Sequence, residues 1–165
     1  MARPDLENIV TLPLLDRLTD LDPKEPADPP VTRAQSVRQL KAALRRDLEW
    51  LFNTRANPDT PMDMGEVLRS VYNYGLPDYT HFVLNNPHDR SRLQKRMEVA
   101  IAYFEPRLSG VSVRLLDTSY EPGKALRFHI DGLLKMDPAP ELISFDTVLD
   151  LPTGEYQVKG ESGAR

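Results

Sequence analysis

Apolar residues recur along the chain with two different periods, and the change of period separates a helical part from a sheet part. Between residue 32 and about residue 104 they fall mostly at spacings of three and four, which is typical of one face of a helix. After residue 106 they alternate with polar residues, as in a strand with one buried side. The pattern predicts an α+β fold, with N-terminal helices packed on one face of a C-terminal antiparallel β-meander.

Helix start and stop signals frame two long helices. Thr32 and Gln35 fit a capping box and open the first helix, which continues to about residue 52. The second opens at Asn86-Pro87, an N-cap followed by proline, and ends by about residue 104, because Pro106 disfavours helical backbone before it. The first helix has an apolar stripe at Val37, Leu40, Leu44, Leu48 and Leu51, and a polar face with Arg38, Lys41, Arg45, Arg46 and Glu49 that we interpret as solvated.

Shorter elements are expected around these helices. One or two helical turns near residues 67–71 end at Gly75, in a left-handed conformation. Gly132 is a candidate β-bulge. Strands are expected at 111–117, 126–131 and 143–150, with a turn at 121–124 and a short edge strand at 155–158.

The N-terminal region has a different organisation. Leu14, Leu15, Leu18 and Leu21 fall on one side of a short helix, and residues 22–31 contain four prolines that favour an extended linker. Such a helix either packs on its own domain or docks on another subunit, and both interpretations stay open. We therefore expect an N-terminal docking helix and linker at 1–31, a single α+β domain at 32–150 and a C-terminal tail at 151–165.

Composition excludes several classes of function. A net charge of −4 over 165 residues argues against a nucleic-acid binder. There is no cysteine, no apolar run near 18 residues and no basic-then-apolar start, so we expect a cytoplasmic protein without a membrane insertion. The three histidines lie on separate segments, and the glycines are scattered, which predicts neither a metal site nor a nucleotide cofactor.

Candidate chemistry centres on Glu105, Pro106 and Arg107, where the helical period changes to the strand period. As a general acid of a glycoside hydrolase, Glu105 would need a second carboxylate, for which Asp78 and Asp131 are the available guesses. The adjacent Arg107 argues against this, because a guanidinium favours the charged carboxylate. The alternatives are a rigid recognition pair facing outward and an internal ion pair that shapes the turn.

Four runs of sequence resemble the baseplate wedge family of contractile tails, once described as lysozyme-like, and in particular its type VI secretion branch. They are LLDRL at 14–18, RRDLEWLFNTR at 45–55, SVYNYGLPDYT at 70–80 and AIAYFEPRLSGVSV at 100–113. The resemblance implies a non-enzymatic, cytoplasmic baseplate subunit that helps to start assembly of the contractile sheath.

The resemblance also implies partners and site residues. Glu105, Pro106 and Arg107 match the family's docking motif, which binds the helical core bundle of neighbouring wedge subunits of the TssF, TssG and TssK types. Together with Leu14, Leu15 and Leu18 they are the expected partner-binding residues, and no residue is expected to be catalytic. The C-terminal sheet is similar to the strand-exchanging domain of the sheath subunit, which implies strand addition. The alternative function is a peptidoglycan hydrolase that uses Glu105 as general acid.

Overall fold

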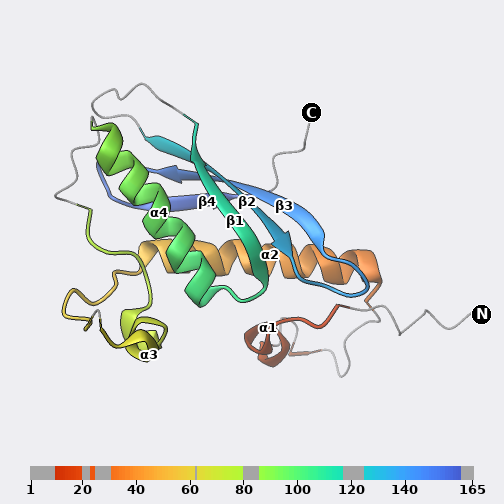
Figure 1. Ribbon diagram of the computed structural model, residues 1–165. Coiled ribbons are helices and arrows are strands. Elements are labelled where there is room, and N and C mark those ends of the chain that lie inside the picture. The colour runs from red at the N-terminus through yellow and green to blue at the C-terminus, as the bar shows by residue number, and fades with distance from the viewer. Residues whose placement is uncertain are drawn as a thin grey trace, which may run out of the picture.

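Helices come first in the chain and a four-stranded antiparallel sheet follows, which confirms the predicted α+β fold (Figure 1). The computed structural model describes residues 10–19, 23–24, 31–61, 63–79, 86–116 and 125–160. Most of the expected linker, Leu21, His81, the turn expected at 121–124 and the last five residues lie outside this part.

The two long helices begin where their capping residues predict. Thr32 and Gln35 form the capping box, with both reciprocal hydrogen bonds present, and the Asn86 side chain accepts from the backbone amide of His88. The first short helix ends at Leu18, earlier than the leucine pattern predicts, because Thr19 is already extended. The helices are α1 (Leu14–Leu18), α2 (Arg33–Asn53), α3 (Gly65–Leu68) and α4 (Pro87–Phe104), with a 3-10 turn η2 (Val71–Asn73).

The sheet is a meander in which each strand pairs with the next. Its strands are β1 (Leu108–Leu115), β2 (Leu126–Leu134), β3 (Glu141–Leu149) and β4 (Tyr156–Lys159). The bulge expected at Gly132 lies on the neighbouring strand instead, between Ser109 and Ser112. Gly132 pairs regularly with Ile143, whereas Gly110 has the positive φ of +60° that a bulge glycine adopts. The prediction was therefore wrong about which strand carries the bulge.

One face of the sheet packs against α2 and α4, and the other face is polar. The shared core consists of leucines and aromatic residues from both layers, among them Leu44, Leu48, Leu93, Met97, Ile101, Phe128, Ile130, Leu134 and Phe145. The opposite face carries Arg114, His129, Asp131 and Asp146, which pair with one another across three strands. The α4–β1 connection lies at one end of this core, next to α2 (Figure 1).

Two of the family-like runs meet at a parallel bridge between Arg55 and Leu76. Gly75 has a φ of +116°, so the positive φ expected there is confirmed. It follows the 3-10 turn η2, however, and a Cβ at this position would lie 2.3 Å from the backbone oxygen of Thr54. Glycine is therefore required by the close approach of two backbones as well as by its conformation.

Candidate functional site

The corner between α4 and β1 is a tight turn fixed by backbone hydrogen bonds. The amide of Glu105 closes the last turn of α4 on Ile101 at 2.8 Å, and its carbonyl accepts from the amide of Leu108 at 3.1 Å. Lys135, which follows β2, donates its amide to the carbonyl of Arg107 at 2.8 Å and its Nζ to that of Pro106 at 2.9 Å. The turn is thus held from both the helix and the sheet.

The carboxylate of Glu105 faces the interior and pairs with Arg107, so the expectation of an outward-facing pair was wrong and the alternative of an internal ion pair is confirmed. Glu105 is 4% exposed, and its carboxylate accepts from the Nε of Arg107 at 2.6 Å, from its Nη2 and from its backbone amide at 3.1 Å. Pro106 stops the helix, and the chain then turns back over the core. The carboxylate therefore lies under the turn, where its hydrogen-bond donors among the described residues all belong to Arg107.

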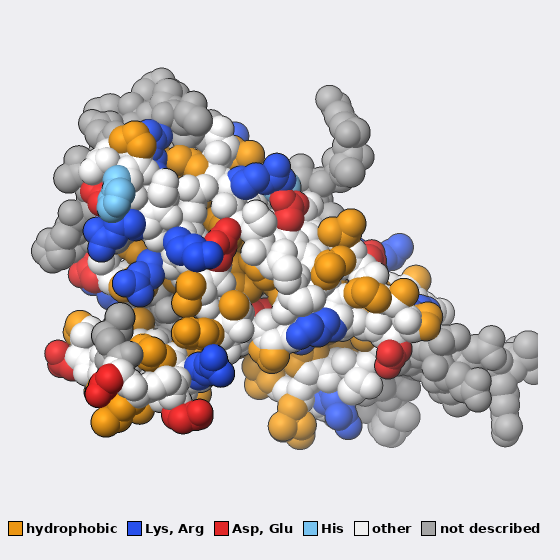
Figure 2. Space-filling view, viewed as in Figure 1, with side chains coloured by type: hydrophobic (Ala, Val, Ile, Leu, Met, Phe, Trp, Pro, Cys, Tyr) orange, Lys and Arg blue, Asp and Glu red, His pale blue; other side chains and the backbone are white. Residues whose placement is uncertain are grey.

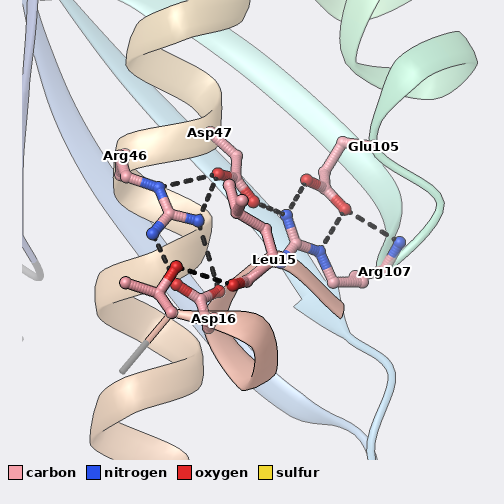
Figure 3. A network of polar contacts seen from close by, with 7 residues as sticks. Leu15, Asp16, Arg46, Asp47, Glu105 and Arg107 are labelled. Atoms are coloured by element: carbon pink, nitrogen blue, oxygen red, sulfur yellow. Dashed lines mark hydrogen bonds and ion pairs between the residues drawn. The ribbon is translucent and has the colours of Figure 1, made fainter. Parts of the chain in front are cut away.

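A second ion pair extends this contact to α2 and α1 (Figure 3). The Nη2 of Arg107 also donates to Asp47 at 2.6 Å. The other oxygen of Asp47 accepts from Arg46 at 2.8 and 3.0 Å, and Arg46 reaches Asp16 of α1 at 2.5 and 3.2 Å. We call these five residues, Asp16, Arg46, Asp47, Glu105 and Arg107, the corner network.

The charges of the corner network shift several pKa values in the direction that favours ion pairs. Burial disfavours the charged form of Arg107, but hydrogen bonds and charges from Glu105 and Asp47 outweigh it and raise its pKa. The hydrogen bond from Arg46 lowers the pKa of Asp16. Burial, with the charges of Asp47 and Glu105, raises the pKa of the nearby Tyr74. Asp16 and Arg107 are therefore both charged at neutral pH.

An open cavity of about 390 Å³ lies beside the corner network. Its walls include all three residues of the Glu105–Arg107 turn. The segment that leads into α1 contributes Thr11, Leu12 and Pro13. Apolar side chains of the helical layer complete the wall, namely Leu40, Leu48, Leu51, Tyr74 and Phe104. The Nη1 of Arg107 is buried and has no hydrogen-bond partner among the described residues. The cavity therefore offers an apolar wall next to the charged turn.

The leucines of α1 remain on the surface next to this cavity. Leu14, Leu15 and Leu18 are 67%, 50% and 74% exposed, and hydrophobic side chains are visible over α1 in Figure 2. Asp16 of α1 pairs with Arg46 of α2. Val10 and Leu12, which precede α1, pack against the core. The structure thus brings the predicted partner-binding residues to one side of the molecule, with the leucines outside and the charged pair beneath.

The carboxylates proposed to assist Glu105 in hydrolysis lie elsewhere. Asp78 pairs with Arg55, and Asp131 pairs with Arg114 and His129 on the polar face of the sheet. Asp47 is the carboxylate that approaches Glu105, and a single nitrogen of Arg107 bridges the two. Within the described residues no group of three histidine or acidic side chains could hold a metal. No helix in the same part of the chain is long and apolar enough to cross a membrane.

Asp47 is the residue that the sequence interpretation missed. It lies three residues after Leu44 and four before Leu51, so the helical period places it at the edge of the apolar stripe. A carboxylate at the edge of a buried stripe needs a charged or hydrogen-bonding partner, so the spacing of Asp47 from Leu44 and Leu51 could have identified it as part of the site. Arg46 was assigned to a solvated face, whereas it bridges Asp47 and Asp16 and stacks 4.9 Å from the Trp50 ring.

In this fold a helical layer packs on a β-meander, and the Glu-Pro-Arg turn joins the two layers through the ion pairs of Arg107 and the hydrogen bonds of Lys135. A family model described as "Baseplate wedge protein gp25" matches residues 38–139, which include most of α2 and all of α4, the turn, β1 and β2. The chain therefore belongs to the gp25 baseplate wedge family, a family of structural baseplate components.

Two other comparisons add to this result. A solved structure described as "The baseplate complex from the type VI secretion system" is similar, with a TM-score of 0.46 and 17% identity over 67% of this chain and 94% of that chain. A search of curated proteins found no match. The family membership rests on the family model.

Proposed function

We propose that this chain is a non-enzymatic wedge subunit in the baseplate of a type VI secretion system, and that it acts in the cytoplasm. The observation that carries the proposal is the family match, which includes the Glu105–Arg107 turn and the α2 residues Arg46 and Asp47. The assignment to the type VI branch is supported by the runs at 14–18, 45–55, 70–80 and 100–113. In this proposal residues 32–150 form the wedge domain, and residues 1–31 carry the docking helix and its linker.

The docking surface consists of the cavity wall at Glu105, Pro106 and Arg107 together with Leu14, Leu15 and Leu18 of α1. Apolar side chains exposed to this extent over a charged corner favour contact with another protein. The buried Nη1 of Arg107 has no acceptor in the described part of the chain, and a buried donor without a partner costs about 1–3 kcal/mol.

The partners in this proposal are wedge subunits of the TssF, TssG and TssK types, followed by the sheath subunit at the sheet. The Glu-Pro-Arg turn does not present a free acid to a partner, because the carboxylate of Glu105 is already bonded to Arg107. We infer that the ion pair instead sets the shape of the cavity, and that the partner contacts Pro106, Arg107 and the apolar wall.

A catalytic role for Glu105 is disfavoured by the same bonds. A glycosidase needs one carboxyl group with a proton to give and a second across the scissile bond. Both oxygens of Glu105 accept from Arg107, and the shared nitrogen of Arg107 fills the space between Glu105 and Asp47. We therefore propose that the chain does not cleave peptidoglycan.

Co-purification with the co-expressed wedge subunits tests the proposal. Arg107→Lys keeps the positive charge but lacks the planar guanidinium that bonds Glu105 and Asp47 at the same time. We therefore expect this variant not to co-purify with the wedge subunits. Thermal unfolding of each variant separates loss of binding from loss of fold. A complex that survives both Arg107→Lys and Glu105→Gln would contradict docking at this turn. Clearing of cell-wall suspensions by the purified protein, lost in Glu105→Gln, would support the hydrolase instead.

A further inference from the structure

The backbone of the Glu105–Arg107 turn is hydrogen-bonded at every donor and every carbonyl. The amide of Glu105 donates to α4 at 2.8 Å, and that of Arg107 donates to the Glu105 carboxylate at 3.1 Å. The three carbonyls accept one hydrogen bond from the start of β1 and two from Lys135. Pro106 has no amide and is exposed. Docking at the turn therefore depends on where this bonded backbone places Pro106 and the Arg107 side chain.

The two hydrogen bonds from Lys135 have different origins. Its amide lies 2.8 Å from the carbonyl of Arg107 and continues the β1–β2 ladder, in which Leu108 pairs with Leu134. Any residue other than proline at position 135 could make this bond. Its Nζ lies 2.9 Å from the carbonyl of Pro106, and only a long side chain with a donor can make that contact. Because fixing an exposed lysine costs rotamer entropy, the second bond is a specific property of this side chain.

The connection from β2 to β3, which begins with Lys135, is itself fixed to α2. Arg33 donates through its Nη2 to the carbonyl of Asp137 at 2.7 Å. At the far end of the connection, Lys41 pairs with Glu141 at 2.9 Å. Lys135 therefore holds the turn from a segment that is anchored to the helical layer.

The side chain and the backbone of Arg107 are held by different parts of the molecule. Glu105 and Asp47 bind its guanidinium (Figure 3). Lys135 binds its carbonyl and the carbonyl of Pro106 before it. A group that is fixed in this way before binding loses less conformational freedom when a partner arrives, and the affinity is higher for that reason.

We propose that Lys135 is a positioning residue of the docking turn, and that its Nζ sets the shape of Pro106 and Arg107 to which the neighbouring wedge subunit binds. This inference rests on the proposed function and adds a residue outside the Glu-Pro-Arg turn on which the affinity depends. Without the Nζ bond the turn samples more conformations, and docking has to order it again. Lys135 thus acts through the turn and is not itself the contact.

Amide hydrogen exchange in the isolated protein tests whether the Lys135 side chain holds the turn. Lys135→Met keeps a long unbranched side chain without a donor, so we expect the amides of Arg107 and Leu108 to exchange about fivefold faster. Lys135→Arg keeps a charged donor and should restore slow exchange. Lys41→Met removes the lysine at the far end of the same connection and is the matched control, with both amides unchanged. Equal exchange in Lys135→Met and the unchanged protein would overturn the inference, whatever the chain binds.

Affinity for the purified complex of wedge subunits tests whether the held turn matters for docking. Lys135→Met should bind about tenfold more weakly, while Lys135→Arg and Lys41→Met bind as the unchanged protein does. Faster exchange with unchanged affinity would overturn the role in docking. Weaker binding without faster exchange would make Lys135 a direct contact and overturn the positioning role. If the unchanged protein does not bind either, the proposed function fails and the positioning role fails with it, even where exchange shows that Lys135 holds the turn.

Discussion

The Glu105–Arg107 turn borders the cavity, and α1 follows directly on residues 11–13 of its wall, but the turn and α1 are held in place by different means. The turn joins α4 to β1, its Glu105 carboxylate is buried, and its guanidinium also pairs with Asp47 of α2. None of the five residues of α1 is buried, and a single ion pair, Asp16–Arg46, joins the helix itself to α2. The family match begins at residue 38 and thus includes the turn but not α1. The difference indicates that the turn is part of the fold, whereas α1 can move without unfolding it.

Removal of Arg107 should show the largest effect of this difference. Arg107→Ala leaves the buried Glu105 and Asp47 next to each other without their shared cation, so we expect a loss of roughly 3–5 kcal/mol in the free energy of unfolding. Urea titration followed by circular dichroism measures it. A loss below about 1 kcal/mol would mean that the turn contributes no more to the free energy of unfolding than α1 does.

The Asp47 carboxylate connects the two regions, so neutralising it should have an intermediate effect. Asp47→Asn keeps one oxygen that can accept but loses the charge that faces both Arg46 and Arg107. We expect a loss of about 1.5–3 kcal/mol, the range for hydrogen bonds to charged groups. The same urea titration applies, with Arg38→Gln on the exposed side of α2 as a control that should change little.

Detachment of α1 should cost much less. Asp16→Asn weakens the ion pair with Arg46, and surface ion pairs contribute about 1 kcal/mol or less. Global stability should therefore change by less than about 1 kcal/mol. The only tryptophan of the chain, Trp50, lies under the Arg46 guanidinium, so its fluorescence should change when Arg46 is released. Loss of stability equal to that of Arg107→Ala would contradict a separable α1.

Acidification should release α1 before the turn unfolds. Because the pKa of Asp16 is lowered in the folded protein, its contribution is complete above the ordinary value of 3.8 and is lost as the pH falls through the folded pKa. The pKa of Arg107 is raised above its ordinary value, so its charge is unaffected by acid. Trp50 fluorescence against pH should show a transition below pH 3.8 that is absent in Asp16→Asn.

The sequence was sufficient for the elements but not for the direction of the side chains at the site. Periodicity and caps predicted α2 and α4, because each signal is local to its own helix. The orientation of Glu105 was not predicted, because it depends on Asp47, which is 58 residues away in the chain but reaches the same guanidinium. The bulge was assigned to the wrong strand for a similar reason, since Gly110 and Gly132 lie close to each other across β1 and β2.

The affinity of the leucine variants for the purified wedge-subunit complex tests the central claim most directly. Leu14→Ser, Leu15→Ser and Leu18→Ser are combined in one variant. Leu142→Ser on β3 is the control, because Leu142 is 74% exposed, as Leu18 is. Serine at these exposed sites should change stability by about 0.5 kcal/mol or less each. If α1 and the turn form one docking surface, the triple variant binds at least tenfold more weakly and Leu142→Ser binds normally. Equal affinities for the triple variant and the unchanged protein would contradict the claim that α1 belongs to the docking surface.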